Sequence, residues 1–229
     1  MPRSIRASEG GVCYHVLNRS NARAEVFRKA EDYQAFLDAV AEAAVRVPVR
    51  VLGYCLMPNH FHLVVRPTGD GDLSRWMHWL MTAHVRRYLT HYHHSGHVWQ
   101  GRFKAFPIQD DGHLLTVLRY VERNPLRANL VPRAQDWLWS SLHPSARNRP
   151  PKLDPGALPR PSDWTERVNA AMSPVEEEAV RVSIRRGKPL GSPHWVHQTA
   201  ARLGLDFTLR DRGRPRKSVE NHGNTPEIA

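Results

Sequence analysis

The stretch Gly53-Tyr-Cys-Leu-Met-Pro-Asn-His-Phe-His-Leu-Val-Val65 contains the features that decide the fold. Val49 to Leu56 is an apolar run typical of a strand, and Phe61 to Val65 is a second such run. Between them, Met57-Pro58-Asn59-His60 has the chemistry of a tight turn, with proline in the second position and asparagine in the third. The stretch therefore predicts a β-hairpin.

Two histidines stand one residue apart at the start of the second predicted strand. Successive side chains on a strand point to opposite faces, so His60 and His62 share one face and Phe61 enters the other. Two neutral imidazoles side by side make half of a metal site. The alternative is a pair of half-exposed surface histidines, which is the commoner meaning of an isolated His-x-His pair.

The flanking sequence extends the hairpin into a complete fold. Val12 to Leu17 predicts a strand and Glu31 to Val45 predicts a helix. Arg75 to His94 predicts a long amphipathic helix that stops at Ser95-Gly96, and Trp99 to Pro107 predicts a fourth strand. The order β-α-β-β-α-β predicts an α+β, ferredoxin-like fold, in which two helices cover one face of an antiparallel sheet. The other face is left open.

A further predicted helix, His113 to Asn124, is halted by Pro125. Tyr120 and Asn124 are four residues apart, so they lie on the same face of this helix. If the helix lies beside the open face of the sheet, it directs a phenol and an amide oxygen toward the two imidazoles. The alternative is that Tyr120 is an ordinary core aromatic and Asn124 an ordinary helix end.

Composition restricts the class of partner. The 229 residues contain 33 Lys and Arg against 22 Asp and Glu, a formal net charge of +11. Such an excess favours polyanionic partners such as nucleic acid. The N-terminus lacks the apolar segment of a signal peptide, and no run of about 18 apolar residues occurs, so we expect no membrane association. We expect Cys13 and Cys55 to be buried thiols in a reducing cytosol, without a disulfide.

The sequence contains three blocks in this order: PNHFHLVV (58–65), WQGRFK (99–104) and RYVERNPLRANLV (119–131). Together they resemble the single-tyrosine HUH transposases of bacteria. GKPLG (187–191) and RGRPRK (212–217) are similar, more specifically, to segments of the REP-associated tyrosine transposases, which act on repetitive extragenic palindromes. The catalytic resemblance spans roughly residues 10 to 132.

The resemblance implies a role for each residue of the proposed constellation. Tyr120 would be the nucleophile that cleaves single-stranded DNA beside a hairpin, through a 5′-phosphotyrosine intermediate. His60 and His62 would hold a divalent metal, Mg²⁺ or Mn²⁺, with Asn124 as third ligand. Because an imidazole must be neutral to ligate, we expect metal binding to fail below a pH of roughly 6 to 7.

The resemblance also implies a cellular setting. We expect a cytoplasmic, nucleoid-associated bacterial protein that acts as a monomer on single-stranded DNA with a REP-like hairpin, a dimer being the alternative. Two other functions stay open: a hairpin-binding module or repressor without strand transfer, and a metal phosphohydrolase acting through water. Mutation of Tyr120 separates the three.

Basic and aromatic residues around the site are candidates for DNA contact. On the predicted fourth strand Arg102 and Lys104 share a face, Phe103 points into the core, and Trp99 is placed to stack on unpaired bases. Arg127 directly follows the tyrosine helix. The weaker candidates are Arg19, Arg23, Arg86 and Arg87. The histidine-rich stretch His91 to His97 is interpreted as helix capping or DNA-facing surface and not as a ligand set.

The chain is expected to contain four parts. Residues 1–135 form the HUH nuclease domain, and 136–161 form a packing segment, Trp137 to Leu142, with a proline-rich linker in which order lapses. Residues 162–206 form an appendage of two helices, Asp163 to Arg186 and His194 to Leu203.

Residues 207–229 form a basic, disordered tail. Its RGRPRK segment resembles an AT-hook, whose arginines fit a narrow minor groove. A tail that adds only nonspecific affinity is the alternative. The basic residues in question are Arg212, Arg214, Arg216 and Lys217.

Overall fold

A computed structural model of the chain describes residues 8–210. Its centre is one antiparallel sheet of four strands in the order β2-β3-β1-β4. The strands are β1 (Cys13–Arg19), β2 (Val49–Met57), β3 (His60–Pro67) and β4 (Lys104–Ile108). The basic residues of the AT-hook-like segment, 212–217, lie outside the described residues.

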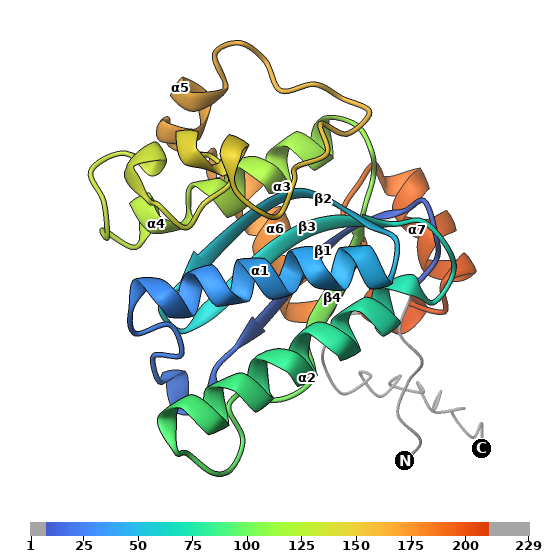
Figure 1. The fold of residues 1–229 in the computed structure, drawn as a ribbon. Coiled ribbons are helices and arrows are strands. Elements are labelled where there is room, and N and C mark those ends of the chain that lie inside the picture. The colour runs from blue at the N-terminus through green and yellow to red at the C-terminus, as the bar shows by residue number, and fades with distance from the viewer. Residues whose placement is uncertain (1–7, 211–229) are drawn as a thin grey trace, which may run out of the picture.

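Helices cover both faces of this sheet (Figure 1). Helices α1 (Ala30–Arg46) and α2 (Asp72–Tyr92) lie side by side on one face, and α3 (Gly112–Glu122) packs against β2 and β3 from the other. This is the ferredoxin-like arrangement with one added helix, as predicted. The remaining α-helices described are α4 (Asn124–Arg127), α5 (Trp164–Asn169), α6 (Pro174–Arg186) and α7 (Pro193–Arg202).

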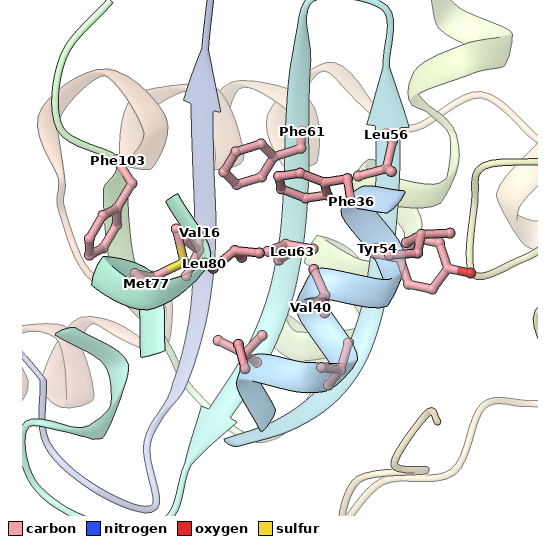
Figure 2. Close-up of a cluster of buried hydrophobic side chains, with 14 of the residues drawn as sticks. Val16, Phe36, Val40, Tyr54, Leu56, Phe61, Leu63, Met77, Leu80 and Phe103 are labelled. Atoms are coloured by element: carbon pink, nitrogen blue, oxygen red, sulfur yellow. The ribbon is translucent and has the colours of Figure 1, made fainter. Parts of the chain in front are cut away.

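The main core lies between the sheet and the α1–α2 layer. Phe61 and Leu63 of β3 project into it and meet Phe36 of α1 and Leu80 of α2, all of them fully buried (Figure 2). A second core on the opposite face contains Val64 and the apolar side of α3. Alternation along β3 therefore separates the two faces, so that every second residue from His60 onward lies under α3.

The predicted hairpin is confirmed. Met57 pairs with His60, so Pro58 and Asn59 form the whole connection between β2 and β3. The turn is held from outside, because the amides of Ser20 and Val26 donate to the carbonyls of Asn59 and Pro58, at 2.9 Å each. The loop that follows β1 therefore fixes the position at which His60 enters the sheet.

The long second helix ends earlier than predicted. Its last residue is Tyr92, and His93 takes a left-handed conformation with φ of 48°. The amides of His93 and His94 both donate to the carbonyl of Leu89, which satisfies the helix end before Ser95-Gly96 is reached. The histidine-rich stretch thus includes the helix cap and is exposed, in agreement with its interpretation as capping surface.

The predicted fourth strand is shorter than its sequence indicates. Leu17 of β1 pairs with Lys104, and Ser20 pairs with Trp99. The segment from Trp99 to Lys104 is therefore two residues longer than the stretch of β1 that it faces, and it forms a bulge. The side chain of Asn18 donates to the carbonyl of Gly101 at 3.1 Å in place of a regular ladder bond. Trp99 therefore makes only an isolated bridge, and Arg102 lies outside the strand.

The packing segment at 137–142 lies along the outer edge of β2. Leu56 donates to the carbonyl of Trp139, and Ser141 donates to that of Tyr54, both at 2.9 Å. The residues after it were expected to lose order. They instead follow the same edge, where Asp154 donates to Val51 at 2.8 Å and Arg160 to Leu52 at 2.7 Å, because β2 offers unpaired backbone groups there.

The appendage contains three helices where two were predicted. The interval 163–186 divides into α5 and α6, because Ser173 forms a capping box with Glu176 and Pro174 occupies the first turn of a new helix. Cys13 and Cys55 are buried free thiols, as expected. Within residues 8–210, no helix is long and apolar enough to cross a membrane.

Candidate active site

A cavity of about 480 Å³ lies on the open face of the sheet, under α3 and α6. His60 and His62 enter it from β3, and Tyr120 enters from α3. The remaining lining residues come from β1, the bulged segment, β4, α4 and α6: Leu17, Asn18, Arg19, Gln100, Gly101, Arg102, Lys104, Arg127 and Ile184. The structure thus brings the predicted histidine pair and the predicted tyrosine into one site.

His60 is oriented by its neighbour in the turn. Its Nδ1 lies 2.7 Å from Oδ1 of Asn59, whose Nδ2 donates to the carbonyl of Arg23 at 3.1 Å. A carboxamide oxygen only accepts, so the proton of His60 is on Nδ1. The Nε2 lone pair of His60 is therefore free for a ligand.

His62 is oriented by a histidine that was not selected from the sequence. His15, on β1, lies on the same face of the sheet, and its Nε2 is 2.7 Å from Nδ1 of His62. His62 is 4 % exposed and His15 is fully buried. The sequence signal was the alternation of VCYHVL, which places His15 on the face opposite Tyr14 and Val16.

Burial favours the neutral form of the imidazoles of His15, His60 and His62 at pH 7. It lowers the pKa of His60 to about 4, with smaller contributions from the positive charges of Arg19 and Arg127. It lowers the pKa of His62 well below the usual value and that of His15 to about 3. If these imidazoles bind a metal, its loss is therefore expected at a lower pH than the 6 to 7 predicted from the sequence.

Tyr120 is held close to the histidine pair. Its side chain is buried at 5 % exposure, and its ring centre lies 6.2 Å from that of His62. The hydroxyl accepts a hydrogen bond from Nη1 of Arg127 at 3.1 Å, and the same guanidinium lies over the ring, 4.7 Å from its centre. Tyr120 therefore lines the cavity with its oxygen already paired to a cation.

Asn124 differs from its expected position. Its Oδ1 accepts from Nη2 of Arg127 at 2.6 Å, and its Nδ2 donates to the carbonyl of Tyr120 at 3.0 Å. The amide oxygen thus binds a guanidinium of the same chain. The backbone stays helical through Arg123, so Arg127 lies on the same face as Tyr120 and Asn124. Among residues 8–210, no cluster of three or more His, Cys, Asp or Glu is arranged to hold a metal.

Arg127 also links the site to the appendage. Its Nη1 lies 3.2 Å from Oε1 of Glu177 on α6, which in turn pairs with Arg181 at 2.7 Å. One guanidinium therefore contacts the phenol, the amide oxygen and a carboxylate. Arg127 lines the cavity, and the phosphate-binding role expected of it stays a prediction.

The other candidates for DNA contact fall into two groups. Arg19, Arg102 and Lys104 line the cavity with their exposed side chains. Trp99 is 7 % exposed and packs against Phe61 and His84 with ring centres 5.3 Å away from each, so the predicted base-stacking surface is instead core.

Three further candidates, Arg23, Arg86 and Arg87, do not line the cavity. Arg87 pairs with Asp32 on the α1–α2 face, at 3.6 Å, and Arg86 lines a separate groove along α2. Arg23 is exposed in the loop after β1, and its carbonyl supports Asn59. The α2 candidates are therefore on a different part of the surface from the histidine pair.

A ferredoxin-like sheet with a histidine pair and a tyrosine helix on one face defines the DNA-cleaving transposase class that the motifs indicated. The family model "Transposase IS200 like" matches residues 10–124, which is half of the chain. The chain belongs to that family. The appendage that supplies Glu177 lies beyond the matched region.

Comparisons with individual proteins agree with this placement. A Haemophilus influenzae protein named as a REP-associated tyrosine transposase is 29 % identical over 119 residues, which are 47 % of this chain and 67 % of that protein. A solved REP-associated tyrosine transposase, bound to a REP hairpin, matches with a TM-score of 0.52 and 22 % identity. The match covers 76 % of this chain and 93 % of that protein's chain. The resemblance stated from the motifs is thereby confirmed, and the solved relative shares the fold.

Proposed function

We propose that this protein is a metal-dependent endonuclease and strand transferase for single-stranded DNA that bears a hairpin. The observation that carries the proposal is the shared cavity: Tyr120 on α3 faces the same space as the imidazoles of His60 and His62. The family membership supports DNA cleavage as the reaction class.

Tyr120 would act as the nucleophile. Its phenolic oxygen bonds to the phosphorus while the bond to the 3′-oxygen breaks, and that oxygen leaves with a proton as a 3′-hydroxyl. The product is a 5′-phosphotyrosine, which keeps the energy of the phosphodiester. A 3′-hydroxyl of another strand end can then attack the phosphorus, release Tyr120 and rejoin the DNA, without ATP.

His60 and His62 would hold the divalent cation. The chemistry of the donor set fits this role, because both Nδ1 atoms are engaged by neighbours and both Nε2 atoms remain for the cavity. Asn124 would supply its oxygen once Arg127 releases it. Bound Mg²⁺ or Mn²⁺ would neutralise negative charge on the phosphate and fix it in line for attack.

Hairpin DNA is the proposed substrate. Arg19, Arg102, Lys104 and Arg127 surround the histidine pair with positive charge suited to a phosphate backbone. The relative in H. influenzae is named for REP elements, and the solved relative is bound to a REP hairpin. A bacterial palindrome of this kind would place the protein at the nucleoid.

The deciding experiment is capture of a covalent adduct. Labelled single-stranded oligonucleotides carrying palindromes from DNA near the coding region are incubated with the protein, with Mg²⁺ or with a chelator. We expect a protein–DNA adduct only with metal, and none for Tyr120→Phe, which should still bind the hairpin. Tyr88→Phe, a buried tyrosine on α2 remote from the cavity, is the matched control and should form adduct normally.

Two results would overturn the proposal in favour of the alternatives. Strand cleavage that persists in Tyr120→Phe would indicate a phosphohydrolase that acts through water. Hairpin binding by the unmodified protein, without cleavage in any metal, would indicate a binding module.

A further inference from the structure

His15 is a buried polar side chain that points at the candidate site without lining it. It is fully buried on β1, and its Nε2 is 2.7 Å from Nδ1 of His62. We propose that His15 is a positioning residue, which fixes the tautomer and ring orientation of His62 so that Nε2 of His62 faces the cavity. This inference rests on the proposed metal-dependent function.

The two members of the pair are held in parallel ways. Asn59 accepts the Nδ1 proton of His60, and His15 is placed to accept the Nδ1 proton of His62 through its own Nε2. Both arrangements leave Nε2 as the lone pair that ligates a metal. If the shared proton were instead on Nε2 of His15, Nε2 of His62 would carry a proton and could not ligate.

Packing alone does not explain why position 15 carries a histidine, because the imidazole leaves one buried nitrogen without a partner. In the tautomer proposed, the remaining proton of His15 is on Nδ1, which is buried and finds no hydrogen-bond partner among residues 8–210. The ring also lies against Phe106, with centres 4.9 Å apart, in an apolar layer. A phenylalanine at position 15 would avoid an unpaired polar atom, so the contact with His62 is the feature that only an imidazole provides here.

The first test compares metal affinity with stability in three variants. His15→Phe keeps the ring and removes the acceptor, and we expect it to lower the affinity for Mn²⁺, measured by calorimetry without DNA, by about 10- to 100-fold. Its thermal midpoint should change little, because the variant removes the unpaired Nδ1 of His15 but leaves Nδ1 of His62 without a partner. His15→Gln, which can place an oxygen near the original Nε2, should restore most of the affinity.

His84→Phe is the matched control. His84 is also a buried histidine with an unpartnered ring nitrogen, but it lies among Phe27, Phe36 and Trp99 on the other face of the sheet. It should leave Mn²⁺ affinity unchanged. An equal loss of affinity in His84→Phe, or no loss in His15→Phe, would overturn the proposal.

The second test needs no variant and no metal. Nitrogen-15 NMR of the metal-free protein distinguishes protonated from unprotonated ring nitrogens. We expect the proton of His62 on Nδ1 and that of His15 on Nδ1. A proton on Nε2 of His62 would overturn the inference, even if His15→Phe failed to fold. Absence of Mn²⁺ binding by the unmodified protein would instead count against the proposed function, and the NMR result would still decide the role of His15.

Discussion

Nη1 of Arg127 donates a 3.1 Å hydrogen bond to the hydroxyl oxygen of Tyr120. The other terminal nitrogen of the same guanidinium holds the side-chain oxygen of Asn124, at 2.6 Å. The proposed nucleophile and the proposed third ligand are therefore both engaged by one cation. A phosphate and a metal that enter the cavity must each displace part of this contact.

Removing the charge of Arg127 should strengthen the binding of a metal ion and weaken the binding of DNA. Its positive charge contributes to the lowered pKa of both His60 and His62, so it also opposes a metal cation there. In Arg127→Gln we expect Mn²⁺ to bind several-fold more tightly without DNA, since a nearby like charge is worth on the order of 1 kcal/mol. Single-stranded DNA should bind less tightly. Calorimetry and fluorescence anisotropy measure the two affinities.

The control for this variant is Arg133→Gln. Arg133 lies in the same part of the chain, but its exposed guanidinium pairs with Asp136 and does not line the cavity. Both affinities should stay unchanged. Equal Mn²⁺ affinity in Arg127→Gln and the unmodified protein would contradict the prediction that the charge of Arg127 opposes metal binding.

The buried histidines should make stability depend on pH. The pKa is lowered to about 3 in His15 and to about 4 in His60 and His84, in each case mainly by burial. In the unfolded chain these groups have a pKa near 6.5, so from about pH 6.5 down to 4 the unfolded state binds more protons. Stability should therefore fall as pH falls through that window, by up to about 1.4 kcal/mol per pH unit for each histidine.

Urea denaturation of the metal-free protein at pH 7.5, 6 and 5 measures this dependence. The slope should be shallower in His84→Phe, which removes one of the titrating groups and leaves the site intact. Stability that is constant between pH 7 and 5 would show that the histidines bind as many protons in the folded protein as in the unfolded chain, so that folding does not lower their pKa.

Glu122 should be a main attachment point of the C-terminal half of the chain. It is 1 % exposed, and its carboxylate accepts from Ser141 at 2.6 Å, Trp164 at 2.7 Å and Arg160 at 3.2 Å. Glu122→Gln leaves a buried amide facing these donors and removes the charge partner of Arg160. We expect a loss of about 3 kcal/mol in the free energy of unfolding, measured with urea. The exposed Glu178→Gln should change it by less than about 0.5 kcal/mol.

The basic residues of the cavity should differ from those on α2 in the salt dependence of DNA binding. Arg102 and Lys104 line the cavity, whereas Arg87 pairs with Asp32 on the other face of the sheet. Each of Arg102→Gln and Lys104→Gln should reduce the slope of log affinity against log salt by about 0.7 for single-stranded DNA. Arg87→Gln should leave the slope unchanged. Equal slopes for all three would place the DNA elsewhere.

Local patterns predict much of this protein. The turn chemistry at Pro58-Asn59 and the alternation of His60 with Phe61 are properties of neighbouring residues, and the structure confirms the hairpin and the shared face. The spacing of apolar residues also predicts α3, which carries Tyr120 to the open face.

The parts that sequence missed depend on contacts between distant residues. His15 meets His62 across 47 positions, and only the register of β1 against β3 brings them together. The oxygen of Asn124 is an exception, because its partner Arg127 is only three residues on; helical spacing alone does not decide which partner an amide oxygen takes. Trp99 is buried because it packs against Phe61 and His84, which lie on elements distant from it in the sequence.

Both outer edges of the sheet are bonded to residues that follow the tyrosine helix, at several positions along β2 and at one residue beside β4. Trp139 and Ser141 bond to β2, and Leu190 accepts from Gln109 and donates to Pro107 beside β4, each at 2.9 Å. At these positions, two copies of this chain could pair their edge strands only after these hydrogen bonds had broken. Two copies that keep these bonds would therefore have to meet elsewhere, through helices or loops.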